Sequence, residues 1–163
     1  MTPRITSQLL LETAAFTDGD AIPATYTCDG EDESPEFAIG RVPPGTETLA
    51  FVVDDPDAPS GTFVHWLLWN VPADTIRLPR GVKLGQTVYE LRGARQGSNG
   101  FGTVGYRGPC PPVAHGPHTY RFTLYACDRE LDVPAGASIN DLRPAIEAAQ
   151  LDSARLTGTY ERH

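Results

Sequence analysis

Apolar residues along the chain occur in short runs that predict β-strands. The runs Leu49–Val53 and Thr62–Val71 are bounded by turn residues, and the second is rich in β-forming side chains. Both faces of the second run are apolar, which favours a central strand in a sandwich or a large sheet. The run Thr119–Cys127 alternates between apolar and more polar positions, and Leu156–Tyr160 reads as a final strand.

One segment near the end of the chain has helical periodicity. Leu142, Ala145, Ile146 and Ala149 recur at helical spacing within Asn140–Leu151, with Asn140 or Asp141 as the N-cap. Pro144 fits this helix only if it lies in the first turn. The chain contains 16 glycines and 15 prolines, and we find no repeat or linker. We therefore predict one mostly β domain over residues 1–163, with one clear helix.

Composition narrows the classes of partner. The chain has 13 basic and 21 acidic residues, so its formal net charge of −8 disfavours nucleic acid and anionic membranes as partners. No segment approaches the roughly 20 apolar residues that span a bilayer. The apolar stretch Leu9–Leu11 is too short for the hydrophobic region of a signal peptide. We therefore expect a cytoplasmic protein without membrane insertion.

The three cysteines are Cys28, Cys110 and Cys127, and no Cys-x-x-Cys pair occurs. This pattern signals neither a zinc site nor a disulfide framework. We expect three free thiols in a reducing compartment, and one disulfide between two loops is the alternative.

Two stretches of the chain carry the candidate chemistry. Asp55–Pro59 runs on to His65, and Gly105–Pro112 runs on to His118 and Tyr120. Each stretch joins a proline- or glycine-stiffened loop to a histidine at an apolar run, and β alternation points His118 and Tyr120 the same way. Two histidines can hold a phosphate or a carboxylate. A carboxylate with two histidines can instead hold a metal ion.

Each of these features also has a purely structural interpretation. The Asp55-Pro56-Asp57 sequence is typical of a simple turn, although Asp55 could also orient His65 or accept a hydrogen bond from a ligand. In the proline-rich loop, the amides of Gly108 and Cys110 could bind an anion, or the loop could be only a rigid corner. Cys110 is the only plausible nucleophile nearby, and no nucleophile elbow, phosphate-binding loop or zinc-protease motif occurs.

Together, these motifs resemble the phosphatidylethanolamine-binding protein family, in particular its prokaryotic branch of Raf-kinase-inhibitor-like proteins. The resemblance covers nearly the whole chain, through residues 22–35, 54–72, 105–120 and 156–160. It implies a two-sheet β-sandwich with one C-terminal helix, short helical turns and a small anion pocket at one end. By this resemblance and the motifs, the candidate ligand-binding residues are Asp55, Asp57, Pro59, His65, Gly108, Cys110, His118 and Tyr120.

The resemblance implies a non-enzymatic binding protein for a small anion or a phosphorylated head group. In this hypothesis His65 and His118 donate to the anion, and no catalytic residue, metal ion or cofactor is expected. The alternatives are an inhibitor that contacts a protease or kinase, and a hydrolase that uses Asp55, His65 and His118. Prokaryotic relatives also suggest a homodimer.

The chain departs from the family pattern in ways that bear on the pocket. Thr119 stands where the family has an arginine, which leaves the ligand preference open. Residues 36–39 differ from the family's usual proline, leucine and tryptophan, but Phe37 and Ile39 can still fill core space. A histidine that bacterial relatives often place near Ala149 is absent, and His115 in the loop 113–117 is a candidate to approach the site instead.

Overall fold

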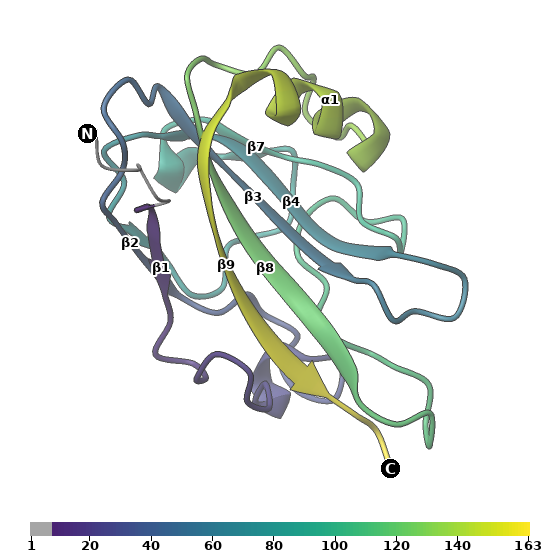
Figure 1. The fold of residues 1–163 in the computed structure, drawn as a ribbon. Coiled ribbons are helices and arrows are strands. Elements are labelled where there is room, and N and C mark those ends of the chain that lie inside the picture. The colour runs from purple at the N-terminus through teal and green to yellow at the C-terminus, as the bar shows by residue number, and fades with distance from the viewer. Residues whose placement is uncertain (1–7) are drawn as a thin grey trace, which may run out of the picture.

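The computed structural model describes residues 8–163, so the start of the predicted 1–163 domain lies outside the described residues. The described chain forms two antiparallel sheets (Figure 1). The small sheet has the strand order β1 (Leu10–Glu12), β2 (Phe37–Gly40), β5 (Arg77–Leu78). The large sheet has the order β6 (Thr87–Val88), β7 (Ala94–Gln96), β4 (Phe63–Pro72), β3 (Thr48–Asp55), β8 (His118–Cys127), β9 (Gln150–Tyr160).

The remaining elements are one α-helix and two short 3₁₀ turns. The helix α1 spans Ile139–Ala149, and the turns η1 and η2 span Ala24–Tyr26 and Tyr89–Leu91. Figure 1 shows β1 and β2 beside the large sheet at the left and α1 at the top. This architecture confirms the predicted fold class of two sheets with one C-terminal helix. No helix among residues 8–163 is long and apolar enough to cross a membrane.

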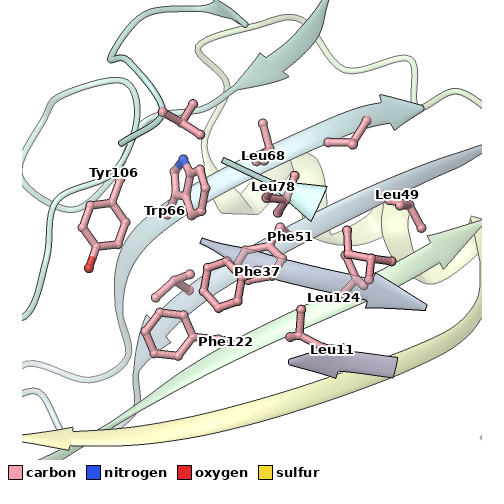
Figure 2. Close-up of a cluster of buried hydrophobic side chains, with 14 of the residues drawn as sticks. Leu11, Phe37, Leu49, Phe51, Trp66, Leu68, Leu78, Tyr106, Phe122 and Leu124 are labelled. Carbon is pink, nitrogen blue, oxygen red and sulfur yellow. The ribbon is translucent and has the colours of Figure 1, made fainter. Parts of the chain in front are cut away.

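The central strands of the large sheet bury both of their faces. Every residue of β3 is buried, and the neighbouring strand β4 alternates between two cores. Trp66 and Leu68 pack in the core between the sheets (Figure 2), whereas Leu67 and Trp69 pack in the core that contains the buried face of α1. The apolar patterns therefore correctly predicted a central strand, because only a strand covered on both sides needs apolar residues at every position.

The helix differs from its prediction at both ends. Ser138 precedes its first residue, and after Ala149 the chain enters β9 directly, where Gln150 pairs with Cys127 of β8. Pro144 is therefore the sixth helical residue and not part of the first turn. Both Pro144 and Asn140, whose carbonyl would have bonded to residue 144, are exposed, so solvent can satisfy that carbonyl.

The shortest strands were not predicted from the sequence. β5 lies within the long segment between β4 and the motif loops, and β7 lies within the glycine-rich stretch 93–108. Strands of two to four residues are too short to show an alternating pattern. The small sheet nevertheless contributes Phe37 and Ile39 to the core, as their apolar character suggested.

Candidate functional site

A cavity of about 290 Å³ opens at one end of the large sheet, where β3 ends and β4 and β8 begin. In Figure 1 this end of the sheet lies at the right and lower right. The cavity is lined by residues of the β3–β4 hairpin, of the glycine- and proline-rich loop before β8, and of the strands themselves: Asp55, Ala58, Pro59, Ser60, Gly61, Thr62, Phe63, His65, Phe101, Cys110, Pro111, Pro112, His118 and Tyr120. Six of the eight predicted residues lie here, and their binding of a ligand stays a prediction.

Asp55 is the last residue of β3 and is buried, rather than lying in a turn beyond the strand. Its Oδ2 accepts a hydrogen bond from Nδ1 of His118 over 2.6 Å, and its Oδ1 accepts the Asp57 backbone N–H over 2.7 Å. Asp55 therefore orients His118, whereas the sequence suggested either His65 or a ligand as its partner. The two strands place these side chains together because the end of β3 lies beside the start of β8.

His65 is held by the backbone of the loop before β8. Its Nδ1 lies 2.7 Å from the carbonyl oxygen of Arg107, and a carbonyl only accepts, so Nδ1 carries the hydrogen. Burial lowers the pKa of His65, although the Arg107 hydrogen bond and the charge of Asp55 oppose this effect. The ring is therefore neutral at neutral pH, and Nε2 is an acceptor. The predicted donation from His65 to an anion needs a second proton on the ring.

Tyr120 presents an unpaired hydroxyl at the cavity. The side chain is 1% exposed, and its hydroxyl has no hydrogen-bond partner among the described residues. Burial, followed by the negative charge of Asp55, raises the pKa of Tyr120, so the phenol keeps its proton. Its ring meets the His65 ring edge-on at 5.3 Å and stacks with the His118 ring at 6.3 Å. Tyr120 can therefore donate into the space between two histidines.

His115 does not itself line the cavity but contacts His118 from the loop before β8, so it approaches the site as the sequence suggested. Its Nδ1 lies 2.7 Å from Nε2 of His118, and His115 itself is exposed. Asp55, His118 and His115 thus form a chain of hydrogen bonds from a buried carboxylate to the surface. His118 has both ring nitrogens engaged.

Two predicted residues, Asp57 and Gly108, do not line the cavity. The Gly108 backbone N–H donates to Oδ1 of Asp32 over 2.6 Å, so this amide is used within the protein. A Cβ on Gly108 would lie 2.0 Å from the Tyr26 carbonyl oxygen, so the loop needs glycine for close backbone approach. Asp57 accepts the Thr119 backbone N–H over 2.9 Å and so ties the hairpin to β8.

The expectation of three free thiols is wrong. Cys28 and Cys110 form a disulfide, and Cys127 is free and buried in the core. The partners are 82 residues apart in the sequence and lie in two loops, so no local spacing signals the bond. A disulfide sulfur is not a nucleophile, so Cys110 is not the nucleophile that the sequence offered as a candidate near the site.

One part of the cavity wall is aromatic, which was not predicted from the sequence. Phe101 is half exposed and meets Phe63 edge-on at 4.8 Å. The ring of Phe63 packs directly on Gly100, where a Cβ would lie 2.4 Å from it. A lone phenylalanine between two glycines reads as an ordinary loop residue, and an exposed aromatic between turn glycines was the only available signal.

The polar groups of the cavity are few and differ in chemical character. Within residues 8–163, no three His, Cys, Asp or Glu side chains lie close enough together to hold a metal ion. The cavity instead offers a phenol donor from Tyr120, an acceptor at Nε2 of His65, and the Asp55–His118 pair, beside apolar walls. Few polar groups in a mostly apolar pocket are typical of a small-ligand site.

Comparison with known proteins places this fold and site in context. The phosphatidylethanolamine-binding protein family profile matches residues 12–161. A UPF0098 protein of Methanothermobacter thermautotrophicus is 45% identical over 152 residues, which are 93% of this chain and 98% of that protein. The structure of a phosphatidylethanolamine-binding protein homologue from Chlamydia trachomatis is similar, with a TM-score of 0.85, 32% identity, and 97% of this chain and all of that chain covered. Escherichia coli YbcL is also similar, with a TM-score of 0.86, 28% identity, and 95% of this chain and 99% of that chain covered.

Proposed function

Because the chain belongs to the phosphatidylethanolamine-binding protein family, we propose that its cavity binds a small anion, such as phosphate or a phosphorylated head group. The family supports a binding protein, and the residues of the cavity support the more specific statement about the ligand.

The observation that carries the proposal is the hydroxyl of Tyr120. Leaving a buried hydroxyl without a hydrogen bond costs about 1–3 kcal/mol. Other side-chain polar groups in the buried interior of the described chain are paired, for example the Trp66 indole with the Gln96 side chain. An unpaired donor that lines a cavity is therefore best explained by a ligand oxygen that accepts its hydrogen bond.

The protonation state of His65 further narrows the range of possible ligands. Its Nε2 is an acceptor, so a favourable ligand offers a hydrogen-bond donor as well as a negative oxygen. Monohydrogen phosphate has both, and so does phosphoethanolamine through its ammonium group. The apolar walls of Phe63, Phe101 and the prolines suit the carbon skeleton of a head group.

Isothermal titration calorimetry with phosphate and with phosphoethanolamine tests this function. We expect binding to the wild type, a loss of about tenfold or more in Tyr120→Phe, and no measurable binding in the His65→Ala, His118→Ala double variant. Tyr89→Phe is the matched control, because Tyr89 is 86% exposed and does not line the cavity.

The Tyr120→Phe variant can also be tested by its stability. Without added ligand, Tyr120→Phe should be as stable as the wild type or more stable by about 1 kcal/mol in urea unfolding, because it removes an unpaired buried hydroxyl.

In the calorimetric titrations, an absence of heat with the wild type, or undiminished binding in the His65→Ala, His118→Ala double variant, would overturn the assignment of the pocket.

The other expectations from the sequence stay predictions. The protease or kinase target, the homodimer and the cytoplasmic location have no direct support from the cavity. The Cys28–Cys110 disulfide bears on the location, since disulfides persist mainly in oxidising compartments and, within cells, in hyperthermophiles. The hydrolase alternative, which uses Asp55, His65 and His118, also stays a prediction, and the disulfide removes only Cys110 as a candidate nucleophile.

A further inference from the structure

His115 competes with any ligand for one edge of His118. Its Nδ1 lies 2.7 Å from Nε2 of His118, and the two rings meet edge-on with centroids 5.0 Å apart. The other nitrogen of His118 is bound to Asp55. An anion that is to accept a hydrogen bond from His118 must therefore take the place that His115 occupies.

The number of protons on the two imidazoles decides whether their contact can form. Since Asp55 accepts the Nδ1 hydrogen, neutral His118 has its lone pair at Nε2, and His115 must donate. One additional proton can still be accommodated, because Nε2–H of His118 can donate to a lone pair on His115. With two additional protons, Nε2 of His118 and Nδ1 of His115 both carry a hydrogen, so neither nitrogen can accept and the hydrogen bond is lost.

The backbone of the loop holds His115 in this position. Ala114 and Gly116 on either side of it have φ angles of +63° and +87°, and the Ala114 N–H donates to the Arg162 carbonyl over 2.8 Å. A left-handed conformation costs a non-glycine residue about 1 kcal/mol or more. The loop keeps Ala114 in this conformation, which places the exposed His115 in contact with the buried His118.

Other charged and titratable groups face the pair from each neighbouring element. They are Asp55 of β3, His65 of β4, Tyr120 of β8, Tyr160 of β9 opposite His118, Asp57 of the hairpin and Arg162 near the end of the chain. Asp55 is in direct contact with His118, because its carboxylate accepts the Nδ1 hydrogen. The guanidinium of Arg162 is itself engaged with Asp29 and with the sulfur of Cys110. Asp55 is therefore the charged partner of His118.

We propose that His115 is a specificity-determining residue of this cavity, which occupies Nε2 of His118 and gives it up to an anion when both imidazoles are protonated. This inference rests on the proposed function. The unpaired Tyr120 hydroxyl supports it independently, because the Tyr120 ring stacks on His118. An anion in the place of His115 would then receive a hydrogen bond from protonated His118, and the unpaired Tyr120 hydroxyl stays available to a ligand oxygen in the cavity.

Phosphate titrations of the full chain at about pH 7.5 and about pH 5.5, on either side of the usual histidine pKa of about 6.5, test the inference. His115→Ala frees Nε2 of His118 at any pH. His115→Asn keeps a small amide close to the position of Nδ1, which can donate or accept but does not titrate. His163→Ala is the control, since His163 is exposed and does not line the cavity. Comparing variants at one pH cancels the ionisation of phosphate itself.

We expect His115→Ala to bind phosphate about tenfold more tightly than the wild type at the higher pH, because the hydroxyl of monohydrogen phosphate can donate to the freed lone pair at Nε2 of His118 and no contact with His115 has to be broken first. As acid protonates both imidazoles, the contact is lost in the wild type and the difference should shrink. His115→Asn should bind more weakly than the wild type at the lower pH. His163→Ala should match the wild type throughout.

Two results would overturn the inference in different ways. If the wild type binds phosphate but His115→Ala binds it equally well with the same pH dependence, His115 is not a determinant and the proposed function stands. If neither protein binds phosphate at either pH, both the function and the inference fail. Histidine side-chain NMR without added ligand at one pH checks the contact itself. The Nε2 resonance of His118 should shift in His115→Ala because its hydrogen-bond partner is gone, and an unchanged resonance contradicts the pairing.

Discussion

At the scale of single residues, His65 links the cavity to the stability of the fold. Its ring is buried, and its pKa in the folded protein is lowered from the usual 6.5. Between the two pKa values the unfolded chain binds more protons than the folded chain, so the free energy of unfolding rises with pH there. This contribution is fully present above about pH 6.5 and is lost as the pH falls towards the pKa of the folded state.

We therefore predict that His65→Gln weakens the pH dependence of stability. Urea unfolding between about pH 7.5 and about pH 5 should show a smaller slope in the variant, by at most one proton or about 1.4 kcal/mol per pH unit. Glutamine can keep a hydrogen bond to the Arg107 carbonyl but does not titrate. The exposed His163 provides the control variant His163→Gln, which should keep the wild-type slope. Equal slopes in wild type and His65→Gln would contradict the prediction.

At the scale of elements, the cavity depends on loops that are fixed to one another as well as on strands. The loop before β8 packs against the segment around η1, where the Gly108 amide bonds to Asp32 and the Tyr106 hydroxyl donates to the Tyr26 carbonyl over 2.6 Å. This contact positions the His65 partner, the carbonyl of Arg107, next to Gly108. A substitution that separates the two segments would therefore also move the Arg107 carbonyl and disturb the position of His65 in the cavity.

Gly108→Ala is the sharpest test of this packing. The new Cβ would lie 2.0 Å from the Tyr26 carbonyl oxygen, and backbone on both sides must move. We expect the free energy of unfolding to fall by more than about 2 kcal/mol in urea titrations. Gly40→Ala serves as the control, because its Cβ would meet only a leucine side chain at an ordinary 3.5 Å. A Gly108→Ala protein as stable as Gly40→Ala would show that the close approach is unimportant.

The elements also show which parts of the molecule could be predicted from the sequence. β3, β4, β8 and α1 were predicted because each is long enough to repeat its apolar pattern. The alternation in β8 correctly placed His118 beside Tyr120 on one face. The pairing of His118 with Asp55 and His115, the engagement of the Gly108 amide, and the disulfide all join residues that no local pattern relates, so they could not be predicted.

At the scale of the whole molecule, the Cys28–Cys110 bond closes a large loop of the chain and fixes a wall of the cavity. Cys110 lines the cavity, and Cys28 belongs to the segment that follows η1. Reduction of this disulfide would therefore release one wall of the candidate site. Cys127 lies apart in the other core, where burial raises its pKa to about 11, so its thiol is unreactive.

We predict that denatured, unreduced protein has one reactive thiol and that reduced protein has three. The Cys28→Ser, Cys110→Ser double variant should lose roughly 2–4 kcal/mol of unfolding free energy, because its unfolded chain is less constrained. A phosphine reductant should destabilise the wild type to a similar extent and leave the double variant unchanged. Three reactive thiols in the unreduced wild type would rule out the bond.

The hydrogen bond from the Ala114 amide to the Arg162 carbonyl can be used to follow the position of the loop that carries His115. Ala114 precedes His115 in the loop, while Arg162 follows β9, so this single amide is shielded from solvent only while both segments keep their places. Its rate of hydrogen–deuterium exchange therefore measures how often the two separate. A change in that rate with acidification or with added phosphate would follow the motion of the loop directly, one residue away from the imidazole that moves.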